Sequence, residues 1–166
     1  MRKLGFLIIL LTLLLDQLSK NWVLLSYGGV SRSIAEITSF FNLVMVWNRG
    51  VSFGMFSEHP EWMPIILTVV ALGITAILIG WLWKAENKTT TIALSLVIGG
   101  AIGNVIDRVR FGAVVDFLDF HAFGYHWPAF NVADAAIFIG VVLLLIETIM
   151  EPNPETKTTE TIKESS

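Results

Sequence analysis

Four long apolar segments divide the chain and are separated by stretches of mixed or polar character. They cover residues 4–25, 62–83, about 90–106 and about 133–150. A helix of about 22 residues is about 33 Å long, which is enough to cross a hydrocarbon core of ~30 Å. The pattern therefore predicts an all-α membrane protein with four transmembrane helices.

The first segment begins like a secretory signal peptide, because Arg2 and Lys3 precede an apolar run. The run continues into DQLSKNWVLLSY without a small-x-small cleavage site. We therefore interpret it as a retained transmembrane helix. The third segment, TTIALSLVIGGAIGNVI, is rich in small residues, which favour close helix contact in lipid.

An even number of spans places both termini on the same side of the membrane. Lysines and arginines are slightly more numerous on that side, which favours cytoplasmic termini. The side of the termini would hold Arg2, Lys3, Lys84, Lys88, Lys157 and Lys163, and the other side would hold Arg32, Arg49, Arg108 and Arg110. The longer connections, 26–61 and 107–132, are then expected outside the cytoplasm.

Both of these connections have the composition of ordered structure. Residues 39–56 carry β-branched and aromatic runs around Asn48-Arg49-Gly50, a turn signal, and so predict a short extracytoplasmic sheet or hairpin. Residues 111–130 are also apolar and aromatic, and we expect them to lie along the membrane surface. Residues 151–166 are polar and predict a disordered cytoplasmic tail after a transmembrane domain formed by 1–150.

Composition agrees with a membrane protein and excludes several classes of function. The chain is 54% hydrophobic and 15% charged, whereas soluble domains carry about 25% charged residues. Its net charge of −3 argues against binding of nucleic acid, which requires a basic patch. The absence of cysteine excludes disulfides, a cysteine nucleophile and cysteine-ligated metal.

Polar residues inside the apolar segments require an explanation. Asp16 and Lys20 are four residues apart and share a helix face. They either form a structural ion pair or contact a ligand directly. Asn104 and Asp107 share a face at the expected end of the third span, just before Arg108. We expect these residues to support the helix terminus, with Asp107 available to pair with Arg108 or Arg110.

Three further aspartates allow catalysis by a pair of carboxyls. Asp116 and Asp119 lie in VVDFLDF, and in an extended segment residues three apart point to opposite faces, so only one would face a given pocket. Asp134 opens the fourth span, either as a helix N-terminal acid or as the second member of a pair. Two carboxyls in a desolvated cleft share one proton and can perform aspartic-protease chemistry without metal, cofactor or covalent nucleophile.

Two other classes of function remain open at this point. Intramembrane carboxylates also relay protons or bind cations in transporters and channels. The chain shows no evident internal repeat, and its acids cluster on one side, both of which disfavour a transporter. In a membrane-assembly factor, the acids would only pair with arginines.

Four ordered motifs resemble one known family. They are DQLSK (16–20), WNRGVSFGMF (47–56), GGAIGNVIDRVRFGAVVDFLDF (99–120) and PAFNVADA (128–135). Together they make residues 4–150 similar to the lipoprotein signal peptidase (signal peptidase II) family. The resemblance implies a multi-pass aspartic endopeptidase of the bacterial inner membrane that cuts diacylglyceryl-modified prolipoproteins just before the lipidated cysteine. It also implies inhibition by globomycin and contact with membrane lipids.

The resemblance also assigns roles to individual residues. It makes Asp116 and Asp134 the catalytic pair, and it leaves Asp119 outside the pair. Arg49 stands where relatives often have a small or polar residue, so it stays open whether this loop contacts substrate as theirs does. The positions expected to support the fold, shape the pocket or contact substrate are Asp16, Lys20, Asn48, Gly50, Asn104, Asp107, Arg108, Asn131 and Ala133.

Overall fold

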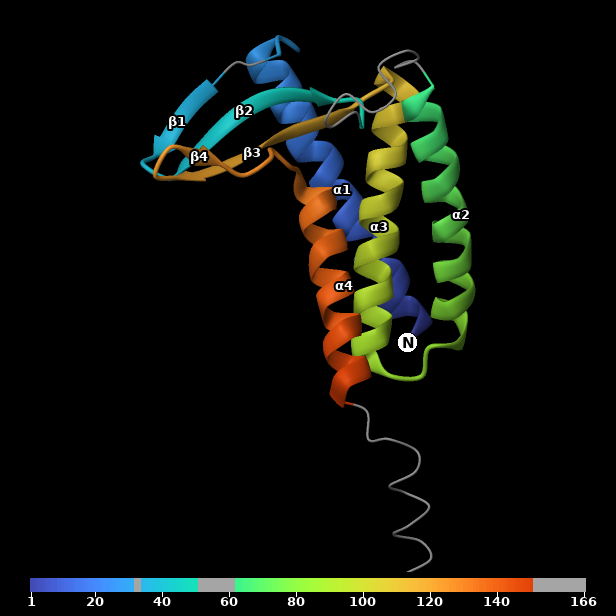
Figure 1. Cartoon of the computed structure of the whole chain (residues 1–166). Coiled ribbons are helices and arrows are strands. Elements are labelled where there is room, and N and C mark those ends of the chain that lie inside the picture. The colour runs from blue at the N-terminus through green and yellow to red at the C-terminus, as the bar shows by residue number, and fades with distance from the viewer. Residues whose placement is uncertain (32–33, 51–61, 151–166) are drawn as a thin grey trace, which may run out of the picture.

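A bundle of four helices carries a small antiparallel sheet at one end (Figure 1). The computed structural model describes residues 1–31, 34–50 and 62–150. The helices are α1 (Arg2–Tyr27), α2 (Met63–Lys84), α3 (Lys88–Phe111) and α4 (Val132–Met150). All four are long and apolar enough to cross a membrane. The prediction of four spanning helices is therefore confirmed within the described part of the chain.

The third helix continues beyond its predicted end near residue 106. Polar residues do not stop it; it ends at Gly112, whose φ of 68° is the left-handed conformation that glycine adopts readily. The Gly112 N–H donates a 2.9 Å hydrogen bond to the carbonyl of Arg108. Asp107 and Arg108 are thus both helical, with Arg108 in the last turn, so the helix ends later than the sequence predicted.

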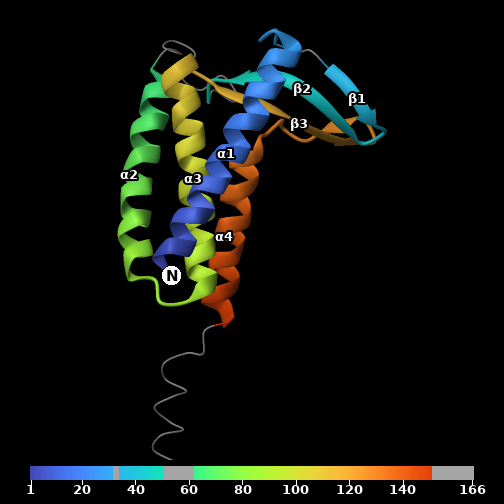
Figure 2. The ribbon, with the colours of Figure 1, turned by 180° about the vertical axis from the view of Figure 1, so that it is seen from behind.

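Helix α3 is the central element of the bundle, and glycines let its neighbours approach. A Cβ on Gly99 would lie 2.9 Å from the Thr12 Cβ of α1. A Cβ on Gly140 of α4 would lie 2.6 Å from the Ala93 carbonyl oxygen of α3. The expected close packing of small residues is therefore present. In contrast, α2 lies at the edge of the bundle (Figures 1 and 2). Most of its apolar side chains are exposed.

The sheet has four strands in the order β1-β2-β3-β4, with every neighbouring pair antiparallel. The strands are β1 (Ile34–Thr38), β2 (Phe41–Asn48), β3 (Val114–Ala122) and β4 (Tyr125–His126). The predicted sheet is thus present, but the turn of its first hairpin lies at 39–40 and β2 ends at Asn48. Residues 51–56 of the predicted sheet segment and the predicted tail, 151–166, lie outside the described residues.

A small apolar core joins the sheet to the bundle and determines where β3 lies. It contains Val23 of α1, Met45 of β2, and Val115 and Phe117 of β3, all buried. The carbonyl of Phe130 accepts hydrogen bonds from the N–H groups of Phe117 and Leu118, at 3.0 and 2.8 Å. These bonds hold the start of α4 beside the middle of β3.

Candidate active site

One asparagine contacts both aspartates that the resemblance selects. Asn131 Nδ2 donates a 2.7 Å hydrogen bond to Asp116 Oδ1. The Asn131 side chain also caps α4, because its Oδ1 accepts a 2.9 Å bond from the Asp134 N–H, and Asp134 Oδ2 accepts one of 3.3 Å from the Asn131 N–H. The structure therefore brings Asp116 of β3 and Asp134 of α4 to the two sides of Asn131.

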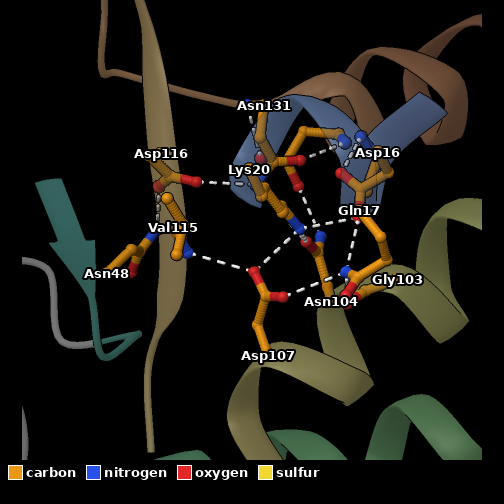
Figure 3. A network of polar contacts seen from close by, with 12 residues as sticks. Asp16, Gln17, Lys20, Asn48, Gly103, Asn104, Asp107, Val115, Asp116 and Asn131 are labelled. Carbon is orange, nitrogen blue, oxygen red and sulfur yellow. Dashed lines mark hydrogen bonds and ion pairs between the residues drawn. The ribbon is translucent and has the colours of Figure 1, made fainter. Parts of the chain in front are cut away.

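Asp116 is buried in β3 and is held at both oxygens. Asn48 Nδ2 donates a 2.8 Å bond to its Oδ2, opposite the bond from Asn131 (Figure 3). Burial raises the pKa of Asp116 to about 7. The hydrogen bond from Asn48 opposes this rise, whereas the neighbouring charge of Asp134 adds to it. Near neutral pH, Asp116 therefore exchanges between its protonated and ionised forms.

Asp134 is more accessible than Asp116. It is half-buried, whereas Asp116 is 1% exposed. Its Oδ1 accepts a 2.7 Å hydrogen bond from Asn104 Nδ2, and it lies in the first turn of α4, where the helix dipole favours a negative charge. The two carboxyls thus differ in burial and in hydrogen-bond partners.

Lys20 contacts three polar side chains next to the Asp116–Asp134 pair. Its Nζ lies 2.9 Å from Asp16 Oδ2, from Asp107 Oδ2 and from Asn104 Oδ1 (Figure 3). Because an ammonium group only donates, it fixes the Asn104 oxygen toward itself and turns the Asn104 amide N–H toward Asp134. The predicted Asp16–Lys20 ion pair is present, and it belongs to a network that orients a contact of Asp134.

Asp107 does not pair with Arg108 or Arg110, contrary to one expectation from the sequence. Its Oδ2 contacts Lys20 and accepts a 3.2 Å hydrogen bond from the Val115 N–H of β3. Since α3 remains helical through this region, the adjacent Arg108 projects from another side of the helix, and Arg110, three residues on, donates a 3.4 Å hydrogen bond to Gln17 Oε1 instead. Asp107 therefore fixes the start of β3 to α1 and α3.

Gln17 and Gly103, which the sequence analysis did not select, also belong to the network around Asp16 and Asp107. Gln17 Nε2 donates to Asp107 Oδ1 at 3.1 Å and to Asp16 Oδ2 at 3.2 Å. Gly103 faces Asp16 so closely that a Cβ there would collide with the carboxylate. The available signals were the glutamine next to Asp16 in an apolar span and the glycine just before Asn104.

Ala133 provides a small, fully buried position at the start of α4. Its N–H donates a 3.0 Å hydrogen bond to Asp16 Oδ1, so a carboxylate from α1 satisfies one of the free N–H groups of this helix terminus. A Cβ on Gly100 would collide with the Ala133 carbonyl oxygen. This contact explains why small residues are needed where α3 meets the start of α4.

Asn48 is oriented by the turn that follows β2. Its Oδ1 accepts a 2.8 Å hydrogen bond from the Gly50 N–H, which leaves its amide N–H groups for Asp116. Gly50 has a φ of 79°, a conformation that residues with a side chain rarely adopt. Gly50 therefore acts on Asp116 through Asn48.

Two of the arginines near this end of the bundle, Arg49 and Arg108, line a cavity of about 550 Å³. Its walls come from α2 and α3, and Arg49 and Arg108 supply its cations. The Nε of Arg108 is buried and makes no hydrogen bond within the described ranges.

Asp119 has different partners from Asp116, as expected for residues three apart on a strand. Asn42 Nδ2 donates to its Oδ2 at 3.0 Å, and His126 Nδ1 lies 3.0 and 2.9 Å from its two oxygens. Burial acts to raise the pKa of Asp119, but the bonds from His126 and Asn42 and the charges of His126 and His121 outweigh it and lower that pKa. Asp119 therefore lies outside the Asp116–Asp134 pair.

Comparison with known proteins identifies the relatives of this chain. The family model described as signal peptidase (SPase) II matches residues 8–150. The chain is 42% identical to a lipoprotein signal peptidase of Rhodopseudomonas palustris, with 89% of this chain and 93% of that protein covered. It is 50% identical to one of Ralstonia nicotianae, with 82% and 79% covered.

Two solved structures, each described as a bacterial membrane enzyme, share this fold. One has a TM-score of 0.74 and 30% identity, covering 89% of this chain and 88% of that chain. The other has a TM-score of 0.77 and 29% identity, covering 90% and 95%. Together with the four apolar helices, these similarities indicate a multi-pass membrane protein.

Proposed function

The chain belongs to the signal peptidase II family, and from this membership we propose that it cuts diacylglyceryl-modified prolipoproteins just before the lipidated cysteine. Asp116 and Asp134 are the proposed catalytic residues. The observation that carries this assignment is their shared contact with Asn131, whose side-chain amide donates to the buried carboxyl of Asp116 and whose main-chain N–H donates to the half-buried carboxyl of Asp134. No other described pair of carboxyls combines this geometry with the family motifs.

In the proposed mechanism, ionised Asp134 removes a proton from water while protonated Asp116 donates its proton to the scissile carbonyl oxygen. The water oxygen adds to the carbonyl carbon and gives a gem-diol. Asp134 then transfers its proton to the cysteine nitrogen, a diol hydroxyl returns a proton to Asp116, and the C–N bond breaks. The raised pKa of Asp116 supports its role as the acid, and the greater exposure of Asp134 supports its role as the base.

The surrounding residues divide into positioning and substrate-contacting roles. Lys20, Asp16 and Asp107 orient Asn104 and the catalytic strand, and Asn48 with Gly50 orients Asp116. Arg108 and Arg49 line the apolar-walled cavity next to the site, where a guanidinium group is suited to a peptide carbonyl or an ester oxygen of the substrate.

A membrane-anchored substrate also accounts for the location of the site. The polar network lies at the end of the bundle that carries the sheet (Figures 1 and 3). We place this end at the extracytoplasmic face of the bacterial inner membrane, with both chain termini cytoplasmic. A lipidated substrate would then enter laterally from the outer leaflet and meet water at the site, and surrounding membrane lipids would contact the exposed apolar helix faces.

The purified protein incubated with a lipidated prolipoprotein tests this function. We expect release of the signal peptide, inhibition by globomycin, and no release from a precursor whose cysteine lacks the diacylglyceryl group. Mass spectrometry of the products locates the cut relative to the cysteine. Absence of product under conditions in which a known relative cleaves the same precursor would reject the proposal and favour the transporter interpretation.

A further inference from the structure

A second cavity lies at the opposite end of the bundle from the candidate active site. It has a volume of about 550 Å³ and forms where α1 crosses α3 next to the end of α2 (Figure 2). The buried Ile98 of α3 forms part of its lining. The apolar side chains that line it are Phe6, Ile9, Ile79, Leu82, Ile98 and Ile102. We name this cavity the α1–α2 groove.

Basic side chains surround one end of the α1–α2 groove. Arg2 and Lys3 line it directly, and both also line a neighbouring hollow of about 660 Å³ together with Lys84. Glu86 is the one carboxylate that lines this hollow. Within residues 1–31, 34–50 and 62–150, none of the three cations forms an ion pair with a carboxylate. With three cations and one carboxylate, the end of the groove therefore carries a net positive charge.

Trp83 places this rim at the membrane interface. The Arg2 guanidinium lies 4.8 Å from the centre of the Trp83 ring, in a cation–π contact that joins α1 to α2. Tryptophan is enriched at the level of the lipid headgroups in membrane proteins. An apolar groove below this level and cations at this level match the two halves of a phospholipid.

We propose that the α1–α2 groove binds one anionic phospholipid, with an acyl chain between α1, α2 and α3 and its phosphate among Arg2, Lys3 and Lys84. Basic pockets between transmembrane helices bind anionic headgroups by the same combination of charge and apolar surface. A zwitterionic lipid fills the groove equally well but leaves the positive charge of the rim uncompensated. The charge of the rim therefore selects for an anionic headgroup.

Such a lipid has a structural consequence for α2. This helix has only two buried residues, Pro64 and Thr75, so it is the helix least held by protein contacts. A lipid in the groove contacts α1, α2 and α3 together and adds apolar contact to the C-terminal half of α2. It therefore stabilises the position of α2 in the bundle, independently of which reaction the protein catalyses.

Native mass spectrometry of the delipidated full-length protein, titrated with phosphatidylglycerol or with phosphatidylcholine of identical chains, tests the proposal. We expect tighter binding of phosphatidylglycerol and a rise in melting temperature only with that lipid. Arg2→Gln and Lys3→Gln should each weaken its binding roughly fivefold, which corresponds to ~1 kcal/mol for one cation near an anionic surface. Lys88→Gln is the matched control, because Lys88 is an exposed cation at the same end that does not line the groove.

A second pair of variants tests the groove itself. Ile79→Trp fills it and should prevent binding, whereas Ile77→Trp, on the same helix but outside the groove, should not. Equal binding of the two lipids, an effect of Lys88→Gln as large as that of Arg2→Gln, or unchanged binding to the Ile79→Trp variant would overturn the proposal. A lipid-free dimer in the spectra would overturn it as well, because a second copy of the chain would then cover the groove.

Discussion

The side-chain amide of Asn131 donates a 2.7 Å hydrogen bond to Asp116, and the same side chain caps the helix that carries Asp134. The position of one carboxyl is therefore coupled to the start of the helix that carries the other. An asparagine suits this role because its amide offers donors and an acceptor at once. Replacement by aspartate would remove the donor to Asp116 and add a third carboxylate.

The first prediction concerns the catalytic pair. Asp116→Asn and Asp134→Asn should each lower the rate of prolipoprotein cleavage by about 10³-fold or more, since each variant lacks one of the two proton-transfer groups. The double variant should be little worse than either single one, because the two groups act as a unit. Rates are measured by single-turnover release of the signal peptide.

Asp119→Asn is the matched control for this experiment, because it makes the same change three residues from Asp116 on the same strand. Cleavage within about threefold of the unmodified protein is expected. Near-normal cleavage by either of the other two single variants, or loss of cleavage in Asp119→Asn with the fold intact by circular dichroism, would refute the assignment of the pair.

The second prediction concerns the pH dependence of cleavage. The mechanism needs protonated Asp116, whose pKa is raised from 3.8 to about 7 mainly by burial. The rate should therefore fall as the pH rises above about 7, approaching tenfold for each further pH unit. A rate that stays constant from pH 7 to pH 9 would show that Asp116 does not act as the acid.

The raised pKa of Asp116 also predicts that this group makes the protein less stable as the pH rises. The usual effect of a carboxyl group is the opposite. The native state favours protonated Asp116, so the contribution of this group to stability is present at low pH and is lost as the pH rises from 3.8 through about 7. Asp116→Asn should remove this pH dependence. Melting temperatures of the two proteins across pH 4 to 8 provide the comparison.

The third prediction concerns Lys20, which is 2% exposed and contacts two buried carboxylates. Lys20→Met should lower the free energy of unfolding by about 3–5 kcal/mol, because it leaves Asp16 and Asp107 buried without their cation. The rate of cleavage should fall too, since Asn104 loses the contact that orients it toward Asp134. Thermal melting and single-turnover kinetics measure the two effects.

A double variant separates loss of charge from loss of packing at this site. Asp107→Asn removes one of the two carboxylates, so Lys20→Met should cost less in that background than in the unmodified protein. Identical losses of stability in both backgrounds would mean that the Lys20–Asp107 contact contributes no interaction energy.

Part of this structure could be predicted from the sequence because it depends on local pattern. The apolar runs predicted all four helices, and the runs in 39–56 and 111–130 indicated ordered connections. The end of α3 was missed because Asp107 and Arg108 were interpreted as a terminus, whereas Gly112 stops the helix five residues after Asp107. Polar residues are compatible with a helix when partners from other elements satisfy them.

The site depended on contacts between distant parts of the chain. Spacing separated Asp116 from Asp119 but could not choose between them, and the choice came from the family motifs. The three contacts of Lys20 join residues of α1 and α3, and the hydrogen bond from Asn131 to Asp116 depends on how β3 lies against the start of α4. Sequence spacing contains no information on such tertiary distances, which is why Gln17 and Gly103 were not recognised.

The last prediction concerns the contact that joins three strands on the other face of β3. Asp119 accepts hydrogen bonds from Asn42 of β2 and contacts His126 of β4, and its pKa is lowered. Its contribution to stability is therefore present above the ordinary value of 3.8 and is lost as the pH falls through the lowered value. Asp119→Asn should lower the free energy of unfolding by only about 1 kcal/mol at pH 6, because the His126 side chain is 56% exposed and water screens the pair. The difference between the two proteins should shrink as the pH falls below 3.8, which denaturant unfolding in detergent measures, and a difference that grew at low pH would contradict the lowered pKa of Asp119.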